Sequence, residues 1–342
     1  MLKFIWSISI QNGRLPNIYK MKIEIFPRIH LTLIDFSLNG YRKFGGIGFS
    51  LNTPSSIIEI IQNESFSFDF KIKGEKVEHL YDNVETVINL AYQKFNLLHK
   101  ASFSINLEYP LHSGLGTGTN LTLACLEGLF IINNKKIERE QIIQLSSRGR
   151  TSGIGIQTYF DGGFVFDGGV KNTDNIFLPS NSNKSNLIAK PIVKCVLPNW
   201  PVLICIPKFL NTISVENERS FFENNTPLMN HEVQEILYHS VFGITSSILE
   251  NDFEAFCVSL KSIQKTKWKL LERSNYSSDL IKLEKKLYDL GADTIAMSSL
   301  GPTIVAFSKN YDDFHEKVIV NMKDEISIYN ANLNNEGRKI YA

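Results

Sequence analysis

Two kinds of spacing between hydrophobic residues alternate along this chain from residue 21 onward. Apolar side chains that alternate with polar ones predict strands, whereas apolar side chains that recur every three or four positions predict helices. The first part of the pattern predicts strands at 23–25, 29–33, 56–61, 65–72 and 101–109, and helices at 78–98, 120–132 and 138–147. Strands come first and helices follow between later strands, which is typical of a mixed β-strand and helix domain.

The second part of the pattern follows residues 171–190, a polar and turn-rich segment that we interpret as a loop or domain joint. It predicts two helices within 231–263, helices at 277–290 and 312–322, and strands at 202–206, 294–297, 303–307 and 326–331. We therefore expect an α+β protein with two domains, residues 21–190 and 191–342. Residues 1–20 precede the first convincing strand, and we interpret them as a loose N-terminal extension or an upstream start, without a function.

Composition and charge narrow the function without identifying it. The 342 residues include 36 lysines and arginines and 35 aspartates and glutamates, which leaves a formal charge of +1. Such a balance provides no general attraction for nucleic acid or an anionic membrane surface. No apolar run reaches the roughly 20 residues that a membrane-spanning helix needs. The four cysteines lie far apart in the sequence, and we interpret them as buried thiols in a reducing compartment, so we expect a cytoplasmic protein. From the charge and the apolar runs we expect no nucleic-acid or membrane partner.

A glycine-rich segment between a predicted strand and a predicted helix carries the strongest local signal for a ligand. Residues 110–119 read P-L-H-S-G-L-G-T-G-T. Glycine lets the backbone reach positive φ and approach a ligand closely, and main-chain NH groups at a helix N-terminus attract anions. A tight turn with hydroxyl helix caps is the alternative. We predict a phosphate or substrate site formed by His112, Gly114, Gly116, Thr117, Gly118 and Thr119.

A second glycine-rich segment combines basic side chains with hydroxyl groups. Residues 148–155 read R-G-R-T-S-G-I-G. Guanidinium groups and hydroxyls are suitable donors for a phosphate, although arginines at the end of a helix can instead cap its carbonyls. Asp167, in a turn farther along the chain, is either a metal ligand or a turn residue. We predict anion binding by Arg148, Arg150, Thr151, Ser152 and Gly153.

Polar side chains on a predicted strand are the candidate catalytic residues Arg28, His30 and Asp35. Arg28 and His30 alternate with apolar residues, so both project from one face of the strand. If this face of the strand is exposed, the two side chains are only solvated. If it is buried, we expect them to contact a ligand. We assign Arg28 to a phosphate or carboxylate and His30 to hydrogen-bond donation. Asp35 is either a magnesium ligand or the partner of one, or it forms a salt bridge with Arg28 or Arg42.

These segments, taken in order, resemble a known family. The segment 110–119 is similar to the phosphate loop of the GHMP kinase superfamily, and the beta-ribofuranosylaminobenzene 5'-phosphate synthase branch fits better than the rest. Thr117 stands where serine is usual, and Val170 stands where histidine is expected. The hallmarks of that branch are found here as P-R-I-H-L-T-L-I-D (27–35), G-G-I-G (45–48), H-S-G-L-G-T-G-T (112–119), R-G-R-T-S-G-I-G (148–155), G-G-F-V-F-D-G-G (162–169), L-P-N-W-P (197–201) and S-L-G-P-T (299–303).

The resemblance implies a GHMP-type two-domain fold, with an N-terminal ribosomal-protein-S5-domain-2-like domain and a C-terminal ferredoxin-like α/β sandwich. It also implies a magnesium-dependent transfer of ribose 5-phosphate from phosphoribosyl diphosphate to 4-aminobenzoate or 4-hydroxybenzoate. Diphosphate and carbon dioxide would be released, in tetrahydromethanopterin biosynthesis. Asp35 and Asp167 are then the candidate ligands of Mg²⁺, and Glu218, Ser299 and Gly301 join the candidate substrate-binding residues. Analogy alone favours a homodimer.

Two alternatives to this transferase stay open. One is an ATP-dependent small-molecule kinase of the same superfamily, in which a serine-glycine-isoleucine run is commonly followed by an aspartate that serves as catalytic base. Here Gly155 follows that run, and general base catalysis typically contributes about 10² to 10⁴-fold. Asp161 or Asp167 is a substitute base from elsewhere in the chain. The other alternative is a non-catalytic phosphate-binding module, against which the retained arginines, His30 and two glycine-rich segments argue.

Overall fold

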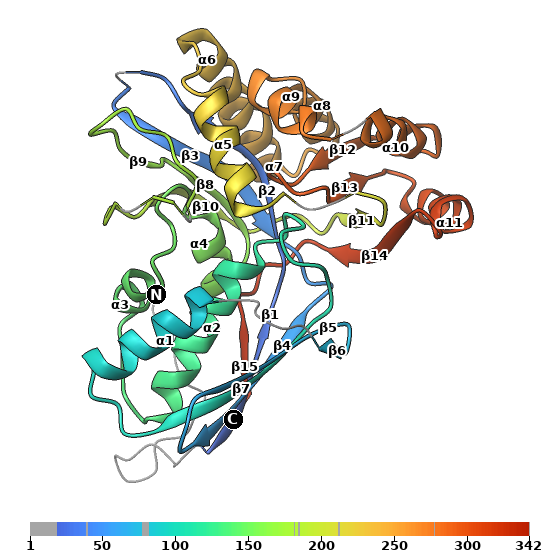
Figure 1. Ribbon diagram of the computed structural model, residues 1–342. Coiled ribbons are helices and arrows are strands. Elements are labelled where there is room, and N and C mark those ends of the chain that lie inside the picture. Colours follow the sequence, from blue (N-terminus) through green and yellow to red (C-terminus); the bar gives the residue numbers. More distant parts are fainter. Residues whose placement is uncertain are drawn as a thin grey trace.

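The computed structural model describes residues 19–38, 40–76, 82–180, 182–183, 185–210, 213–276 and 278–341. Nearly all of the predicted N-terminal extension, and the start of the helix predicted at 78–98, lie outside these ranges. Within them, the strands form three sheets, and helices pack on each side to give the expected α+β architecture (Figure 1). No helix in this part of the chain combines the length and the apolar character needed to cross a bilayer.

A six-stranded sheet forms one end of the molecule, and α2 (Thr117–Ile132) packs directly on it (Figure 1). Its strands alternate as the sequence predicts, and the ring of Phe68 stacks on that of Phe103 at 4.9 Å. Helix α2 is apolar on nearly all sides because α1 (Asp82–Lys94) and α3 (Arg139–Ser146) cover it. The strand order is β15 (Lys339–Tyr341), β1 (Lys20–Ile25), β4 (Ser56–Asn63), β7 (Lys100–Leu107), β5 (Ser67–Ile72) and β6 (Glu75–Lys76).

A second sheet lies in the middle of the molecule and carries β2 (Arg28–Asp35) at its end. Helix α4 (Ile154–Asp161) contacts β2, and so do helices α6 and α9 of the C-terminal half. Strand β2 is therefore buried over most of its length, which places His30 and Thr32 in the interior, while Arg28 and Asp35 at its two ends are half-buried. The order is β10 (Pro191–Cys195), β8 (Phe164–Asp167), β3 (Arg42–Ser50) and β2, and the short β9 (Val170–Lys171) also pairs with β3.

The third sheet has the order β12 (Thr294–Met297), β13 (Ile304–Phe307), β11 (Pro201–Pro207) and β14 (Ile326–Asn332). Alternate residues of β11 and β13 face two different cores. Helices α10 (Ser278–Asp289) and α11 (Tyr311–Met322) close one of these cores. The other core receives a helical layer made of α5 (Val215–Asn225), α6 (Asn230–Tyr238), a π-helical turn (His239–Thr245), α7 (Ser246–Glu250), α8 (Phe253–Ile263) and α9 (Lys267–Ser274).

Most predicted elements are confirmed, with ends that shift by a few residues. The hydrophobic pattern did not predict five elements that build the interior: β3, α4, β8, α5 and α9. Strand β10 pairs with β8, and β15 pairs with β1, so both ends of the segment 191–342 return to sheets that the first half builds. The division of the chain at residue 190 stays a prediction.

Candidate active site

Side chains from both halves of the chain line one pocket, where β2 meets the first turns of α2 and α4 and the helices α5 and α9. The two predicted anion-binding segments and the predicted catalytic strand each contribute to it. The predicted site residues that line this pocket are Arg28, His30, Thr119, Thr151, Ser152, Glu218 and Ser299.

Arg28 is a half-buried cation with one buried donor that has no partner among the described residues. Its amide donates to the carbonyl of Leu115 at 3.1 Å, and its Nη1 donates to the carbonyl of Gly114 at 3.2 Å. Its Nε is buried and has no partner among the described residues. Burial lowers the pKa of Arg28 to about 10, while Glu218 opposes this change, so the guanidinium stays charged near pH 7. A buried donor without a partner is uncommon, which makes Arg28 a candidate contact for an anion.

His30 is fixed through its backbone while its ring keeps one nitrogen unused. The hydroxyl of Ser298 accepts from the His30 amide at 3.1 Å, and the His30 carbonyl accepts from the Ser299 amide at 2.9 Å. The ring Nδ1 is buried without a partner among the described residues. Burial, reinforced by the positive charges of Arg28 and Lys269, holds the pKa of His30 well below its ordinary value. The imidazole is therefore neutral near pH 7 and can donate or accept a hydrogen bond.

Two of the predicted glycines serve a contact between turns. A Cβ on Gly114 would lie 2.3 Å from the carbonyl oxygen of Ser298, and a Cβ on Gly301 would lie 2.2 Å from the carbonyl carbon of Ser113. The hydroxyl of Ser298 also donates to the Gly114 carbonyl at 2.7 Å. The turn 298–301 thus interlocks with the first glycine-rich segment, and the absence of side chains allows this close approach.

The first glycine-rich segment also makes room for Arg28. A Cβ on Gly116 would lie 2.6 Å from Cγ of Arg28, and Gly116 itself has φ of 78°. Helix α2 starts at Thr117, earlier than the predicted residue 120, and Thr119 reaches the pocket from its first turn. The other predicted residues of this segment do not line the pocket: His112, Gly114, Gly116, Thr117 and Gly118.

The second glycine-rich segment is held in place by Asp167. One oxygen of its fully buried carboxylate accepts from the Ser152 hydroxyl at 2.8 Å and the Gly153 amide at 3.1 Å, and the other accepts from the Gly169 amide at 2.9 Å. Burial raises the pKa of Asp167 to about 6. Neither Gly153 nor Arg150 lines the pocket, and Arg150 donates through Nη1 to the Asn183 carbonyl at 2.7 Å. Arg148 does not line it either, although its charge acts on Glu218.

The aspartates predicted as magnesium ligands lie outside the pocket lining. Oδ1 of Asp35 accepts from the amide of Ser37 at 2.9 Å and from its hydroxyl at 2.6 Å. The alternative for Asp35, a salt bridge with Arg28 or Arg42, is not found among the described residues, and Arg42 donates to the Gly169 carbonyl at 2.6 Å. The described part of the chain holds no cluster of three or more histidine, cysteine, aspartate or glutamate side chains suited to a metal. Magnesium binding by Asp35 and Asp167 stays a prediction.

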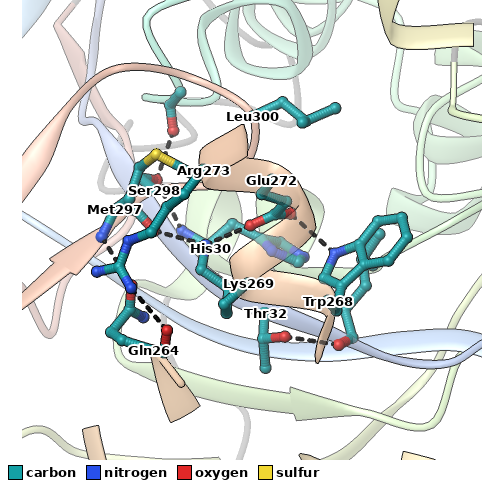
Figure 2. A network of polar contacts seen from close by, with 12 residues as sticks. His30, Thr32, Gln264, Trp268, Lys269, Glu272, Arg273, Met297, Ser298 and Leu300 are labelled. Atoms are coloured by element: carbon teal, nitrogen blue, oxygen red, sulfur yellow. Dashed lines mark hydrogen bonds and ion pairs between the residues drawn. The ribbon is translucent and has the colours of Figure 1, made fainter. Parts of the chain in front are cut away.

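Two carboxyl groups enter the pocket from the C-terminal half. Burial raises the pKa of Glu218 to about 7, while Arg28 and Arg148 act in the opposite direction. Glu272, which the sequence did not predict as a site residue, lines the pocket from α9 and is 1% exposed. Figure 2 shows it beside Trp268 and Lys269 of the same helix, close to His30.

The sequence offered little to identify Glu272. The segment K-W-K-L-L-E-R-S alternates charged and apolar residues, and a lysine and a glutamate three positions apart on a helix usually form an exposed pair. Only the packing of α9 against β2 buries this pair. Lysine and glutamate are almost never fully buried unless they are paired, so the pair becomes noticeable only in the structure.

Comparison with known sequences identifies related proteins. The model of the GHMP kinases N terminal domain matches residues 82–162. The beta-ribofuranosylphenol 5'-phosphate synthase of Archaeoglobus fulgidus is 32% identical over 292 residues, which cover 84% of this chain and 88% of that protein. The protein of the same name from Methanocaldococcus jannaschii is 30% identical over 341 residues, which cover 94% of this chain and 100% of that protein.

Comparison with solved structures agrees on the fold. The homoserine kinase of Cytophaga hutchinsonii superposes with a TM-score of 0.66 at 16% identity, covering 93% of this chain and 97% of that protein. This superposition supports the shared GHMP architecture. Because the identity is so low, it carries no information on the reaction.

Proposed function

The chain belongs to the beta-ribofuranosylphenol 5'-phosphate synthase family, within the GHMP kinase superfamily, and from this membership we propose the reaction that it catalyses. It is a decarboxylating phosphoribosyltransferase that joins phosphoribosyl diphosphate to a para-substituted benzoate and forms a C-riboside 5'-phosphate. Carbon dioxide and diphosphate are released, and the product enters tetrahydromethanopterin biosynthesis. The relatives are named for a phenol product, so we take 4-hydroxybenzoate as the acceptor in preference to 4-aminobenzoate.

One observation carries this proposal. Arg28, whose buried Nε has no partner among the described residues, and Thr119 line one pocket, in which Gly155 stands where the kinases carry an aspartate. Hydrogen-bond donors and positive charge in a water-poor site stabilise a departing diphosphate and position the sugar phosphate. The proposed transfer needs such an arrangement.

The kinase alternative lacks the aspartate that serves as base after the serine-glycine-isoleucine run, because Gly155 stands at that position. A Cβ on Gly155 would already contact the side chain of Thr119 at 3.4 Å. Asp161, one predicted substitute, forms an ion pair with Arg139 at 2.8 Å and does not line the pocket. Asp167, the other, is fully buried and accepts hydrogen bonds from its own loops. The pocket therefore suits glycosyl transfer better than phosphoryl transfer from ATP.

In the proposed step, the ring carbon that bears the carboxylate forms a bond to the anomeric carbon of the sugar while the bond to diphosphate breaks. The para oxygen supplies electrons to the ring. When the bond to the carboxylate breaks, its electron pair restores the aromatic ring and carbon dioxide leaves. Arg28 and the hydroxyl of Thr119 hold the anionic groups, and neutral His30 donates a hydrogen bond within the pocket.

Magnesium is part of the proposal as the ion that neutralises diphosphate charge when bound. Mg²⁺ uses one or two carboxylates and keeps several waters, so a donor set smaller than a cluster of three suffices. Glu218 lines the pocket and fits such a role, and Asp35 and Asp167 stay candidates. Removing Mg²⁺ with a chelator should abolish turnover, and added Mg²⁺ should restore it.

The experiment that tests the function uses the purified full chain with phosphoribosyl diphosphate, magnesium and 4-hydroxybenzoate. Release of carbon dioxide and diphosphate in equal amounts is the expected result. Consumption of ATP by a small alcohol, with no product from phosphoribosyl diphosphate, would favour the kinase. Absence of turnover under every condition would favour a non-catalytic module.

A further inference from the structure

Helix α9 places an ion pair in the interior beside the pocket. Lys269 is 0% exposed and Glu272 is 1% exposed, and Nζ of Lys269 donates to Oε2 of Glu272 and, at 2.9 Å, to the carbonyl of Met297. Buried ion pairs seldom add stability over apolar residues of the same size, because both charges lose their hydration. Stability therefore does not explain this pair, and a functional reason is needed.

The Glu272 carboxylate is held rigidly yet is not saturated. Its Oε1 accepts from the indole Nε1 of Trp268 at 2.8 Å, and its Oε2 accepts from Lys269. The Trp268 ring stacks on Phe36 at 4.0 Å, which fixes the indole donor in turn. A carboxylate has about four acceptor positions, so two stay open after these bonds. Because Glu272 lines the pocket, a bound substrate can reach them.

The same pocket has an apolar wall. Leu33, Phe222 and Leu300 line it together with Glu272. An aromatic ring with one polar substituent would bury its faces against such side chains and direct the substituent to a fixed polar group. The wall and the carboxylate together match an acceptor such as 4-hydroxybenzoate.

We propose, on the basis of the proposed function, that Glu272 is the catalytic residue that accepts the proton of the para hydroxyl of the acceptor. The O–H bond breaks as the proton moves to Glu272, and the phenolate oxygen pushes its electron pair into the ring. The ring carbon then displaces diphosphate from the anomeric carbon. After carbon dioxide leaves and its bonding pair restores the aromatic ring, Glu272 returns the proton to the phenolate oxygen. The residue is thus unchanged over the cycle.

The surroundings of Glu272 suit this role. Burial raises the pKa of Glu272 above its ordinary value, and Lys269, Trp268 and Arg273 oppose that change. A carboxylate balanced in this way is more basic than an exposed one and still ionised when a cation is fixed beside it. The positive charges of Arg28 and Arg148 act on Glu218, the other pocket carboxyl, which is therefore assigned to the anionic end of the donor.

The test compares Glu272→Gln with wild type on two acceptors. Glutamine keeps the size and one acceptor oxygen but cannot take the proton. With 4-hydroxybenzoate we expect kcat to fall about 10²-fold or more. With a ring-fluorinated 4-hydroxybenzoate, whose more acidic phenol needs less help, the loss should be clearly smaller. A structural defect would lower both rates by the same factor, so equal losses, or no loss, would overturn the proposal.

Three controls separate the possible causes. Glu284→Gln makes the same change at the half-buried partner of Arg273, away from the pocket, and should leave the ratio of the two acceptors unchanged. Glu218→Gln should not reproduce the acceptor dependence; if it alone does, the base is Glu218 and the proposal fails. Should Glu272→Gln not fold, Glu272→Asp keeps the charge next to Lys269 and should show the same acceptor dependence in a weaker form. An inactive wild-type enzyme would instead refute the proposed function.

Discussion

Asp167 and Glu272 are both buried carboxylates close to one pocket, and they differ in what surrounds them. Asp167 accepts from two backbone amides and a hydroxyl of its own loops and does not line the pocket. Glu272 accepts from a lysine and an indole of its own helix and opens onto the pocket. Burial alone therefore does not indicate catalysis. A carboxylate that accepts all its hydrogen bonds from its own loops anchors those loops. A carboxylate that is held by its own helix and also lines a pocket can act on a ligand.

The largest effect should follow from removing one half of the buried ion pair. Glu272→Leu leaves Lys269 buried without its counter-charge, and we expect a loss of about 3–5 kcal/mol in the free energy of unfolding. Lys269→Met combined with Glu272→Leu should recover most of that loss, because the unpaired charge is then absent. Urea unfolding of the three proteins measures both values. A single variant as stable as wild type would contradict the buried pairing.

Arg28→Ala tests the cation of the pocket. Loss of this buried donor should lower turnover by about 10² to 10³-fold, as loss of a single stabilising donor does in other enzymes. The fold should survive, because the Arg28 side chain makes one hydrogen bond, to the Gly114 carbonyl. Turnover is measured from phosphoribosyl diphosphate, and circular dichroism checks the fold. Turnover near the wild-type rate would move the anion site elsewhere.

Asp167→Asn tests the anchoring carboxylate. One of its oxygens becomes an NH₂ group that cannot accept, so we expect a loss of about 1–3 kcal/mol and a weaker apparent affinity for the phosphorylated donor. Because the folded-state pKa of Asp167 is raised to about 6, its protonated form favours the fold at low pH. That contribution is complete below the unfolded pKa of about 4 and is lost as the pH rises to about 6.

The pH dependence of unfolding between pH 4 and 6 checks this sign. The stability of wild type relative to Asp167→Asn should decrease as the pH rises through this window. A difference that increases with pH would mean that hydrogen bonding outweighs burial at this carboxylate and that its pKa is lowered instead.

The smallest effect should come from Arg150→Ala. Its guanidinium donates to the Asn183 carbonyl and does not line the pocket, so we expect a loss of about 1 kcal/mol in stability and a modest rise in the KM for phosphoribosyl diphosphate. Steady-state kinetics and urea unfolding measure the two. If KM instead rises as much as it does on loss of a direct contact to a substrate phosphate, Arg150 belongs to the binding site.

The sequence by itself determined the elements whose burial is periodic and the strand that carries the candidate site. The sequence predicted the apolar side of α10, with Leu280, Leu283 and Leu287, because a helix must bury its own apolar face. Arg28 and His30 were readable because polar residues interrupt an apolar strand, and both line the pocket. The ordered motifs identified the family.

Tertiary structure alone decided which of these segments meet. Gly114 and Gly301 lack side chains because two distant turns interlock, and no local pattern announces a contact between residues so far apart in the chain. The charged positions of α9 resemble an exposed face, and only its packing against β2 turns Lys269 and Glu272 inward. The spacing of apolar residues in one helix or strand shows which side of it is buried. It does not show which element packs on that side, because that depends on contacts between residues far apart in the chain.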